Sequence, residues 1–535
     1  MFGNWVPALV PHVLSITTFV GGVILLFSGA TPELRGRVAV ILRFLPLPVI
    51  EISHFLGSLA GMGLLLLARG LQQRLDAAYI LTAALLTFGI VLSLLKGFDY
   101  EEAVALLVML GALLPCRRYF YRKASLFSQP LTLAWVEAVL LVLLGSVWLG
   151  LFSYKHVQYS GELWWRFALS GDASRFLRAT VGAFSLALFF AISRLLAPAP
   201  PKPVIPSPGD LEKVVTMVRK SHATYANLAL LGDKELLFSG TGTAFIMYGI
   251  EGRSWIALGD PVGPEEEWPD LVWQFREMAD RHEGWTVFYE VKPVHLPLYL
   301  DLGLTPIKIG EEARVPLESF SLEGKEGKGF RHVLHQVEGQ GCKFELIPAE
   351  EVSPFLSQLR RISEAWLAEK SAREKRFSLG YFQEDYMRRF PAAIVRREGE
   401  ILAFANVWLG AEREEFSFDL MRYLPESPHG VMDYLFVRLI SWGKQEGYQW
   451  FDLGMAPLSG LGDRALSPLW RRVGTFIFRH GEHFYNFQGL RQYKEKFDPV
   501  WEPRYLAVPA GLALPHVLAN LAALISGGLK GIVAK

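Results

Sequence analysis

The sequence predicts a polytopic α-helical membrane domain followed by a soluble α/β (α+β) part built from two similar halves. Residues 1–200 hold only 15 of the 54 Lys and Arg residues and 9 of the 53 Asp and Glu residues, so charge density roughly doubles after residue 200. The same 200 residues contain apolar runs of membrane-spanning length, and the remainder carries one strand and helix pattern twice. A chain of 535 residues is also too long for one ordinary domain.

Six apolar runs in the first part are candidate membrane spans. They lie at residues 7–28, 44–68, 77–95, 103–115, 131–152 and 176–196. A helix needs about 20 residues to cross the hydrocarbon core of a bilayer, so we expect about six transmembrane helices, the fourth of them short. Arg43, Glu51 and His54 lie at the second run. They could form a lipid-headgroup or proton site, or an ordinary structural pair at the membrane interface.

The charges of the loops predict the orientation of these spans. Residues 117–123 contain four basic residues, whereas the loop at residues 99–102 is acidic. Loops rich in Lys and Arg stay in the cytosol, so six crossings would leave both termini there, although the first loop with Arg35 and Arg37 disagrees. The two cysteines, Cys116 and Cys342, are too few for a disulfide framework and fit a reducing cytosolic side.

A proline-rich stretch at residues 198–208 separates the membrane part from the soluble part and favours an extended spacer. The first half is expected to contain a hairpin around Glu251-Gly252, a helix at 268–279 and a strand at 286–291. The second half is expected to contain a helix at 352–368, a hairpin around Glu398-Gly399, a strand at 415–421, a helix at 430–445 and a strand at 450–453. The predicted divisions are a transmembrane domain at 1–200, a linker at 201–209, α/β domains at 210–345 and 346–507, and a C-terminal helical segment at 508–535.

The C-terminal segment carries an apolar or amphipathic helix around residues 514–525. Its apolar residues recur at helical spacing, and it is nearly uncharged. Since a helix that lies on a bilayer usually has a basic polar face, we expect this one to pack on the preceding domain.

The stretch from Phe484 to Tyr505 combines cations with aromatic residues. Its cations are Arg491, Lys494, Lys496 and Arg504, and its aromatic residues include Tyr485. Cations held against aromatic walls can meet a phosphate, or the negative charge that develops on an ester oxygen during acyl transfer. The alternative is an ordinary basic loop over the edge of a core.

Asp419 and Arg422 lie at the end of a predicted strand. A spacing of three puts the two side chains on opposite faces of a regular strand, whereas a bend would bring both into one cleft. There Asp419 could accept a proton from a hydroxyl or bind an ammonium group, and Arg422 could hold a phosphate. The alternative is a strand-end ion pair of little energetic value. Glu482, which precedes the basic stretch, is open to the same two interpretations.

Other motifs receive little support. Residues 336–341 match the loose pyrophosphate-binding pattern of acetyl-CoA-dependent N-acetyltransferases, but they follow a predicted helix and precede a predicted strand, the reverse of the required context. The sequence contains no Gly-x-Ser-x-Gly, His-Glu-x-x-His or P-loop motif, so the corresponding hydrolase, zinc-protease and nucleotide-triphosphatase functions lack support.

The soluble part resembles the C-terminal synthase domain of the multiple peptide resistance factor (MprF) family, the aminoacyl-phosphatidylglycerol synthases. The segments that carry the resemblance are FSGTGTAFIMYG and ALGDPVG (238–263), WLAEKSAREKRFSLGYF (366–382), FDLMRY (418–423), PHGVMDYLF (428–436), DLGMAPLSGLG (452–462) and FYNFQGLRQYKEKFDPVWEPRYLA (484–507). They span about residues 210–507, and residues 51–71 are similar to the family's later membrane spans.

The resemblance implies tandem acetyltransferase-like (GNAT-like) domains of the Fem type. It implies transfer of an aminoacyl group, lysyl by family precedent, from aminoacyl-tRNA to the glycerol hydroxyl of phosphatidylglycerol. This product would lower the negative membrane charge that attracts cationic antimicrobial peptides. No cofactor is implied, because an aminoacyl ester is already activated. Family members that flip lipid carry further spans ahead of these, so the resemblance points to a short form without the N-terminal flippase module.

The resemblance also implies site residues. It places the family's Asp-x-x-Arg pair on Asp419 and Arg422, its acidic position on Glu482 and its basic position on Lys494 or Lys496. For the chemistry we expect Asp419 or Glu482 to remove a proton or bind the amino group, and Lys494 or Lys496 to stabilise the oxyanion. The residues expected to bind substrate are Arg422 and Arg491, which would take phosphate, and Tyr485, Arg504 and Asp433.

Two alternatives stay open at this point. A Fem-like transferase would use the same donor on an amine of a peptidoglycan precursor, and a non-enzymatic lipid flippase or sensor would carry an inactive soluble domain. For the first hypothesis, the expected partners are aminoacyl-tRNA, phosphatidylglycerol and the lipid bilayer, with a homo-oligomer as a further option. The expected location is the bacterial cytoplasmic (inner) membrane, multi-pass, with the catalytic domain in the cytosol.

Overall fold

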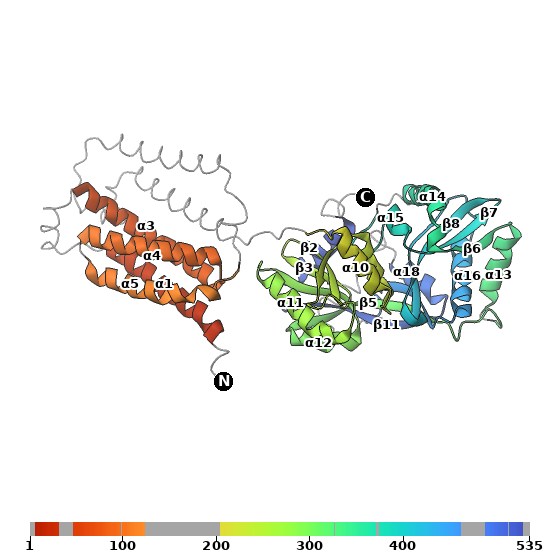
Figure 1. Cartoon of the computed structure of the whole chain (residues 1–535), viewed down its shortest axis with the longest axis horizontal. Helices are drawn as coiled ribbons and strands as arrows, with labels where there is room; N and C mark the ends of the chain where they lie inside the picture. The colour runs from red at the N-terminus through yellow and green to blue at the C-terminus, as the bar shows by residue number, and fades with distance from the viewer. Residues whose placement is uncertain are drawn as a thin grey trace. The chain divides into compact units, whose positions relative to one another are not determined.

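The computed structural model describes residues 6–30, 47–97, 99–122, 204–325, 327–370, 374–461, 487–511 and 513–527. They belong to two compact units, one before and one after residue 202 (Figure 1).

The first unit is helical. Its described helices are α1 (Val6–Ala30), α3 (Leu47–Gln72), α4 (Asp76–Gly97) and α5 (Tyr100–Leu113), followed by a 3-10 turn at Leu114–Tyr119. α1 and α3 pack closely because Gly22 lies against the carbonyl of Gly61, where a Cβ would come within 2.7 Å.

Membrane crossing is only partly supported by these helices. Among the described residues, one helical stretch, Asp76–Leu95, is long and apolar enough to span a bilayer, and Leu9–Leu25 and Leu59–Gln72 are shorter apolar stretches. The expected spans at 131–152 and 176–196 lie outside the described residues, as do Arg43 and the side chains of Glu51 and His54. A domain of six spans therefore stays a prediction.

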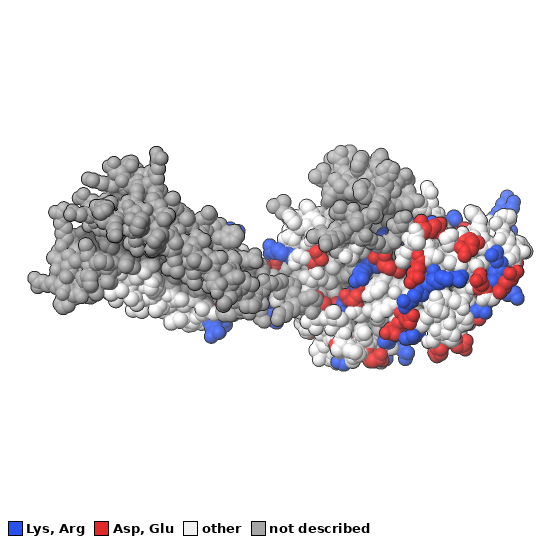
Figure 2. All heavy atoms as spheres, turned by 90° about the horizontal axis from the view of Figure 1, so that it is seen from above, with Lys and Arg blue, Asp and Glu red and all other residues white. Residues whose placement is uncertain are grey.

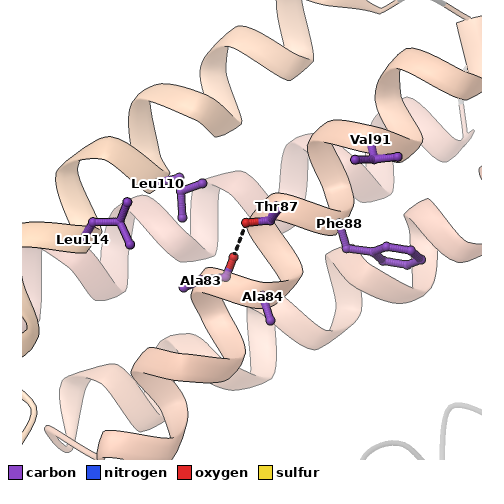
Figure 3. Close-up of a pocket in the computed structure, with 7 residues that line it drawn as sticks. All are labelled: Ala83, Ala84, Thr87, Phe88, Val91, Leu110 and Leu114. Carbon is purple, nitrogen blue, oxygen red and sulfur yellow. Dashed lines mark hydrogen bonds between the residues drawn. The ribbon is translucent and has the colours of Figure 1, made fainter.

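α4 and α5 border an apolar groove of about 500 Å³ (Figure 3). Its lining residues are Ala83, Ala84, Thr87, Phe88, Val91, Leu110 and Leu114. The only hydroxyl among them, on Thr87, donates to the carbonyl of Ala83 at 2.8 Å and so is satisfied within its own helix. Phe88 and Val91 are exposed. An exposed apolar face of this kind is typical of contact with a membrane or with another protein.

The second unit is an α/β structure around a sheet of eleven described strands. The strands are β1 (Glu235–Phe238), β2 (Phe245–Glu251), β3 (Ser254–Leu258), β4 (Trp285–Val291), β5 (Leu304–Pro316), β6 (Lys343–Ile347), β7 (Ala392–Arg397), β8 (Glu400–Leu409), β9 (Glu415–Tyr423), β10 (Trp450–Pro457) and β11 (Val500–Pro509). The described helices are α10 (Pro208–Val218), α11 (Trp268–Asp280), α12 (Leu296–Asp301), α13 (Lys328–Gly339), α14 (Leu356–Glu369), α15 (Glu384–Met387), α16 (Val431–Gln445), α18 (Phe487–Glu495) and α19 (Ala513–Ser526), with a 3-10 segment η2 at Thr224–Leu231.

Each half of this unit repeats one order of elements. In the first half, antiparallel strands β1 to β3 are followed by α11 and by β4, which pairs parallel to β3. In the second half, antiparallel strands β6 to β9 are followed by α16 and by β10, which pairs parallel to β9. This is the acetyltransferase-like fold that the resemblance implied. The element order also confirms the context of residues 336–341, which end α13 and precede β6.

The two halves exchange their last strands. The strand order is β1-β2-β3-β4-β11-β5-β10-β9-β8-β7-β6, so β5 of the first half pairs with β10, and β11 of the second half pairs with β4. β5 and β11 also pair with each other along ten positions, from Val500–Arg314 to Pro509–Leu304. The sheet is therefore continuous, and neither half is complete without a strand from the other.

The predicted hairpin turns owe their form to glycine. Gly252 has φ +57°, and in the second hairpin Glu398 and Gly399 have φ +51° and +90°. Two-residue hairpins require such left-handed backbone because it matches the twist of the flanking strands.

α19 packs on the α/β unit, as its lack of a basic face predicted. The expected contact was with the domain just before it, whereas α19 lies on β2 and β3 of the first half, together with the exchanged strand β11. Val517 and Leu521 are buried in the core, and the Asn520 side-chain amide donates to Ser254 Oγ at 2.9 Å. On the face shown in Figure 2, basic and acidic side chains are mixed over the second unit. Exposed ion pairs of this kind, such as Arg360–Glu384 at 2.6 Å, contribute little stability.

Candidate active site

A β-bulge on β9 brings Asp419 and Arg422 to one side of the sheet. The register between β8 and β9 shifts by one residue between Ala405 and Val407, so Asp419 and Leu420 together face Asn406. Asn406 Oδ1 accepts a hydrogen bond of 2.7 Å from the Leu420 amide. Because the extra residue reverses the alternation of side chains, two residues three apart point the same way. This is the bend that the sequence left open.

The Asp419 carboxylate is held by two donors. Gly380 N–H donates to Oδ1 at 2.8 Å, and the Tyr386 hydroxyl donates to Oδ2 at 2.9 Å. Trp408 Nε1 in turn donates to the Tyr386 oxygen at 3.1 Å. Burial raises the pKa of Asp419 to about 6, against the opposing effect of these hydrogen bonds. The carboxylate is therefore mostly ionised at neutral pH, yet basic enough to accept a proton.

Gly380 is required by this close approach. A Cβ at this position would overlap the carboxylate of Asp419. The backbone can reach the acid only because residue 380 has no side chain.

Arg422 is enclosed by an aromatic ring and an acid. Its guanidinium lies 4.2 Å from the centre of the Trp366 ring, and Nη2 is 3.1 Å from Glu374 Oε2. The other oxygen of Glu374 accepts a hydrogen bond of 3.3 Å from the Phe382 amide. The side chain of Arg422 is only 11% exposed, and burial lowers its pKa. Residues 374–382 thus contact both members of the Asp419–Arg422 pair.

Lys234 brings a cation from the first half to the same place. Its Nζ is buried and donates to the Leu228 carbonyl at 3.2 Å and to Asp233 Oδ1 at 2.8 Å. Burial lowers the pKa of Lys234, and attraction to Asp233 and Asp419 opposes this effect. Lys234 follows η2, whose Thr224 hydroxyl donates to Glu415 of β9 at 2.9 Å. The surroundings of Asp419 are therefore shared between the halves.

Lys494 lies where β9 and β10 part. The two strands pair in parallel up to Ser417–Asp452, and Asp419 and Gly454 each lie two residues beyond the last pair. Lys494 Nζ donates to the carbonyls of Gly454 and Met455 at 2.8 and 3.0 Å.

Lys494 also belongs to a buried charged group. Burial lowers its pKa to about 8, and attraction to Asp452 and to Glu290 of β4 opposes this effect. Burial raises the pKa of Asp452 to about 7, and repulsion by Glu415 adds to this shift. Glu290 has φ +66° at the register shift between β4 and β11, and burial raises its pKa to about 7. The first half therefore also contributes a carboxylate beside Lys494.

The other predicted cations point to separate partners. Lys496 is half exposed and lies 3.2 Å from Asp433, so Lys494 is the buried member of the two predicted lysines. Arg491 pairs with Glu311 and lies 4.3 Å from the centre of the Trp501 ring. Arg504 is buried and pairs with Glu312. Among the described residues, Arg491, Lys496 and Arg504 therefore have different ion-pair partners. Arg504 and Lys494 nevertheless share one influence, since both attract the carboxylate of Glu290.

Glu482 and Tyr485 lie outside the described residues, so their predicted roles stay predictions. Within the described ranges, no group of three or more His, Cys, Asp or Glu side chains is placed to hold a metal ion.

Comparison with known proteins identifies the family to which the second unit belongs. Residues 215–508 match the family model described as "Phosphatidylglycerol lysyltransferase, C-terminal". The chain belongs to the phosphatidylglycerol lysyltransferase family. The predicted family is thereby confirmed. The family match includes both halves of the sheet and both exchanged strands, and it ends before α19.

Relatives and solved structures agree with this placement in the phosphatidylglycerol lysyltransferase family. The chain is 32% identical to the Phosphatidylglycerol lysyltransferase of Bacillus subtilis (strain 168), with 97% of this chain and 60% of the relative covered. It is 35% identical to that of Staphylococcus aureus (strain MSSA476), with 56% of this chain and 35% of the relative covered. The chain thus spans at most 60% of the length of these relatives.

Two solved structures of similar proteins match the same part of the chain. One is the C-terminal domain of a putative lysylphosphatidylglycerol synthetase from Agrobacterium fabrum, at 44% identity and TM-score 0.55, which covers 60% of this chain and 99% of that chain. The other is L-PGS from Bacillus licheniformis, at 37% identity and TM-score 0.55, which covers 61% and 99%. The expectation of a short form without a flippase module stays a prediction.

Several residues of this site could not be recognised from the sequence. Tyr386 and Lys234 come from distant parts of the chain and carried no motif. Trp366, Glu374 and Gly380 all lie in the segment WLAEKSAREKRFSLGYF, which carries the family resemblance but no motif that points to a site. Gly380, a glycine within this charged segment, was the signal in the sequence that the backbone there approaches another group closely.

Proposed function

We propose that this chain transfers an aminoacyl group, lysyl by family precedent, from aminoacyl-tRNA to a glycerol hydroxyl of phosphatidylglycerol in the bilayer. The family match supports the lipid acceptor. The observation that carries the chemistry is the Asp419 carboxylate, held by Gly380 and Tyr386, with its pKa raised to about 6. Such a group suits removal of a proton from an attacking hydroxyl.

In the proposed reaction, the lipid hydroxyl oxygen attacks the carbonyl carbon of the aminoacyl ester while Asp419 takes its proton. The tetrahedral intermediate then breaks its bond to the ribose oxygen of the RNA, and that oxygen receives the proton from Asp419. One ester is exchanged for another, so the step needs neither an oxidant nor a covalent enzyme intermediate. We propose no cofactor for it.

We assign stabilisation of the oxyanion to Lys494. Burial lowers its pKa, and attraction to Asp452 and Glu290 favours its charged form. Two of its three N–H bonds hold the carbonyls of Gly454 and Met455, which leaves one donor for a substrate oxygen among the described residues. Lys496 is half exposed and paired with Asp433, so we do not assign it this role.

We assign to Arg422 the task of keeping Asp419 ionised. Its positive charge lowers the pKa of the acid, while Glu374 balances the remaining charge. Binding of a lipid or RNA phosphate by Arg422 or Arg491 stays a prediction, since Glu374 and Glu311 already pair with these side chains. A location in the bacterial cytoplasmic membrane, with this unit in the cytosol, completes the proposal.

Lipid analysis of a host that makes no aminoacylated lipid tests the proposal. Expression of the full chain should yield a ninhydrin-positive phospholipid, and Asp419→Ala should abolish it. Asp270→Ala, which removes an exposed carboxylate from α11, is the matched control and should change nothing. An aminoacylated peptidoglycan precursor without the lipid would favour the Fem-like alternative. Resistance to cationic peptides that survives Asp419→Ala would favour a flippase or sensor.

A further inference from the structure

Residues 374–383 hold the Asp419–Arg422 pair without having regular secondary structure of their own. The segment supplies the Gly380 amide to Asp419 and the Glu374 carboxylate to Arg422. It forms neither helix nor strand. Its conformation must therefore be fixed by contacts with the rest of the molecule.

Phe377 buries part of this segment against the first half. It is only 4% exposed, and its φ of +63° is a left-handed conformation that bulky residues rarely adopt. Its ring stacks on Tyr289 of β4, with ring centres 6.5 Å apart and planes 28° apart. The ring also fills the space that a side chain at Gly249 of β2 would occupy, since a Cβ there would lie 3.1 Å from the ring. Tyr289 and Gly249 both belong to the first half.

The C-terminal helix α19 covers the same place. The Arg376 amide donates to the carbonyl of Ile525 at 2.9 Å. The Leu524 side chain also lies close to Gly249, 3.3 Å from the position that a Cβ there would take. Leu524 and the Phe377 ring therefore border the same space above Gly249. α19 is itself fixed to the first half through Asn520 and Ser254. The segment is thus held between the first half and a helix that lies beyond the family match.

We propose that Phe377 is a positioning residue, anchored in the first half beneath α19, which fixes residues 374–383 so that Gly380 and Glu374 meet Asp419 and Arg422. The proposal rests on the proposed function in so far as it assigns Asp419 and Arg422 to the reaction. Without the anchor, the Gly380 amide moves away from the carboxylate, and a displacement of about 1 Å at a reacting group can reduce the rate about 100-fold. The first half and α19 therefore control the geometry of a reaction carried out mainly by the second half.

Variants of the full chain, purified in detergent, test this inference by two readouts. Hydrogen exchange of the peptides that cover residues 374–383 reports the anchoring directly, and kcat and KM for transfer report its consequence. Phe377→Ala removes the ring, and Phe377→Leu is a milder change in case the first variant folds poorly. Leu524→Ala tests the contribution of α19. Phe275→Ala is the matched control, because this ring is fully buried on the other face of the same strands.

We expect Phe377→Ala to speed exchange in residues 374–383 at least about tenfold, and to lower kcat about 10- to 100-fold with a smaller change in KM. Phe377→Leu and Leu524→Ala should give smaller changes in the same direction. Phe275→Ala should lower the melting temperature but leave exchange in the segment and kcat of the folded protein nearly unchanged.

Unchanged exchange in the segment for both Phe377 variants would overturn the inference, as would an equal loss of kcat in Phe275→Ala. A wild-type chain that transfers nothing would refute the proposed function instead. In that case the exchange measurement would still decide whether Phe377 anchors the segment.

Discussion

Replacing Tyr386 by Phe should move the acid limb of the pH profile. The change removes one of the two hydrogen bonds to the Asp419 carboxylate, at 2.9 Å, and keeps the ring that packs at 4.8 Å from Phe390. A hydrogen bond to a charged group contributes about 1.5–3 kcal/mol, and one pKa unit corresponds to about 1.4 kcal/mol. The donor stabilises the ionised form, so its loss should raise the pKa of Asp419 from about 6 by about one to two units.

The resulting loss of activity depends on pH. If the pKa rises to about 7.5, the ionised fraction at pH 6 falls from about one half to about 3%, roughly a 15-fold loss of kcat/KM. At pH 8.5 both proteins are almost fully ionised at this position, so their rates should converge. The assay is the initial rate of transfer to phosphatidylglycerol from pH 5 to 9, expressed as the ratio of wild type to variant so that effects common to both cancel.

Tyr434→Phe is the control for this measurement. It removes a tyrosine hydroxyl that bonds to Glu338 at 3.3 Å, away from Asp419. Its pH profile should match that of the wild type. A ratio for Tyr386→Phe that stays constant across pH, or an acid limb that does not move, would refute the role of Asp419 as the ionised base.

Three further changes test the site and its support. Gly380→Ala places a methyl group where the Asp419 carboxylate lies and should lower kcat/KM about 100-fold. Gly240→Ala, with open space around it, should not, and equal rates for the two variants would contradict the close approach. Lys494→Met should lower kcat about 100- to 1,000-fold, because loss of an oxyanion donor has an effect of this size. Lys496→Met should leave kcat nearly unchanged. The reverse pattern would assign stabilisation of the oxyanion to Lys496. Asn406→Ala should destabilise the second unit by about 1–3 kcal/mol in denaturant unfolding, because it leaves the buried Leu420 N–H at the bulge without its acceptor. An unchanged unfolding midpoint would argue against the hydrogen bond between Leu420 and Asn406.

Local patterns predicted most elements of the second unit. The hairpins around Glu251-Gly252 and Glu398-Gly399, and the helices that became α11 and α16, agree with the structure within a few residues. These elements are set by turn chemistry and by hydrophobic periodicity, which act over neighbouring residues. The exchange of β5 and β11 could not be predicted, since the sequence of a strand does not specify which distant strand will pair with it.

The proximity of Asp419 and Arg422 could be predicted because one short motif contains both residues, while their roles in catalysis stay predictions. Asp419 and Arg422 are three residues apart, so the remaining question was whether the strand bends, and the bulge opposite Asn406 supplies the bend. Tyr386 and Lys234 could not be found in this way, because only the fold brings them to Asp419. The basic stretch was expected to act as one group of cations. Lys494 and Lys496 are close in sequence but lie in different environments, because α18 ends between them.

Transfer measured with purified components would show whether this chain moves an aminoacyl group to phosphatidylglycerol by means of Asp419. The full chain in vesicles that contain phosphatidylglycerol would be given lysyl-tRNA labelled in its lysine, and label in the lipid fraction would be counted for the wild type and for Asp419→Ala. We expect labelled lipid with the wild type, and a loss of about 100-fold or more with the variant, since general base catalysis contributes about that much. No labelled lipid from the wild type with any charged tRNA, or equal label from both proteins, would contradict it.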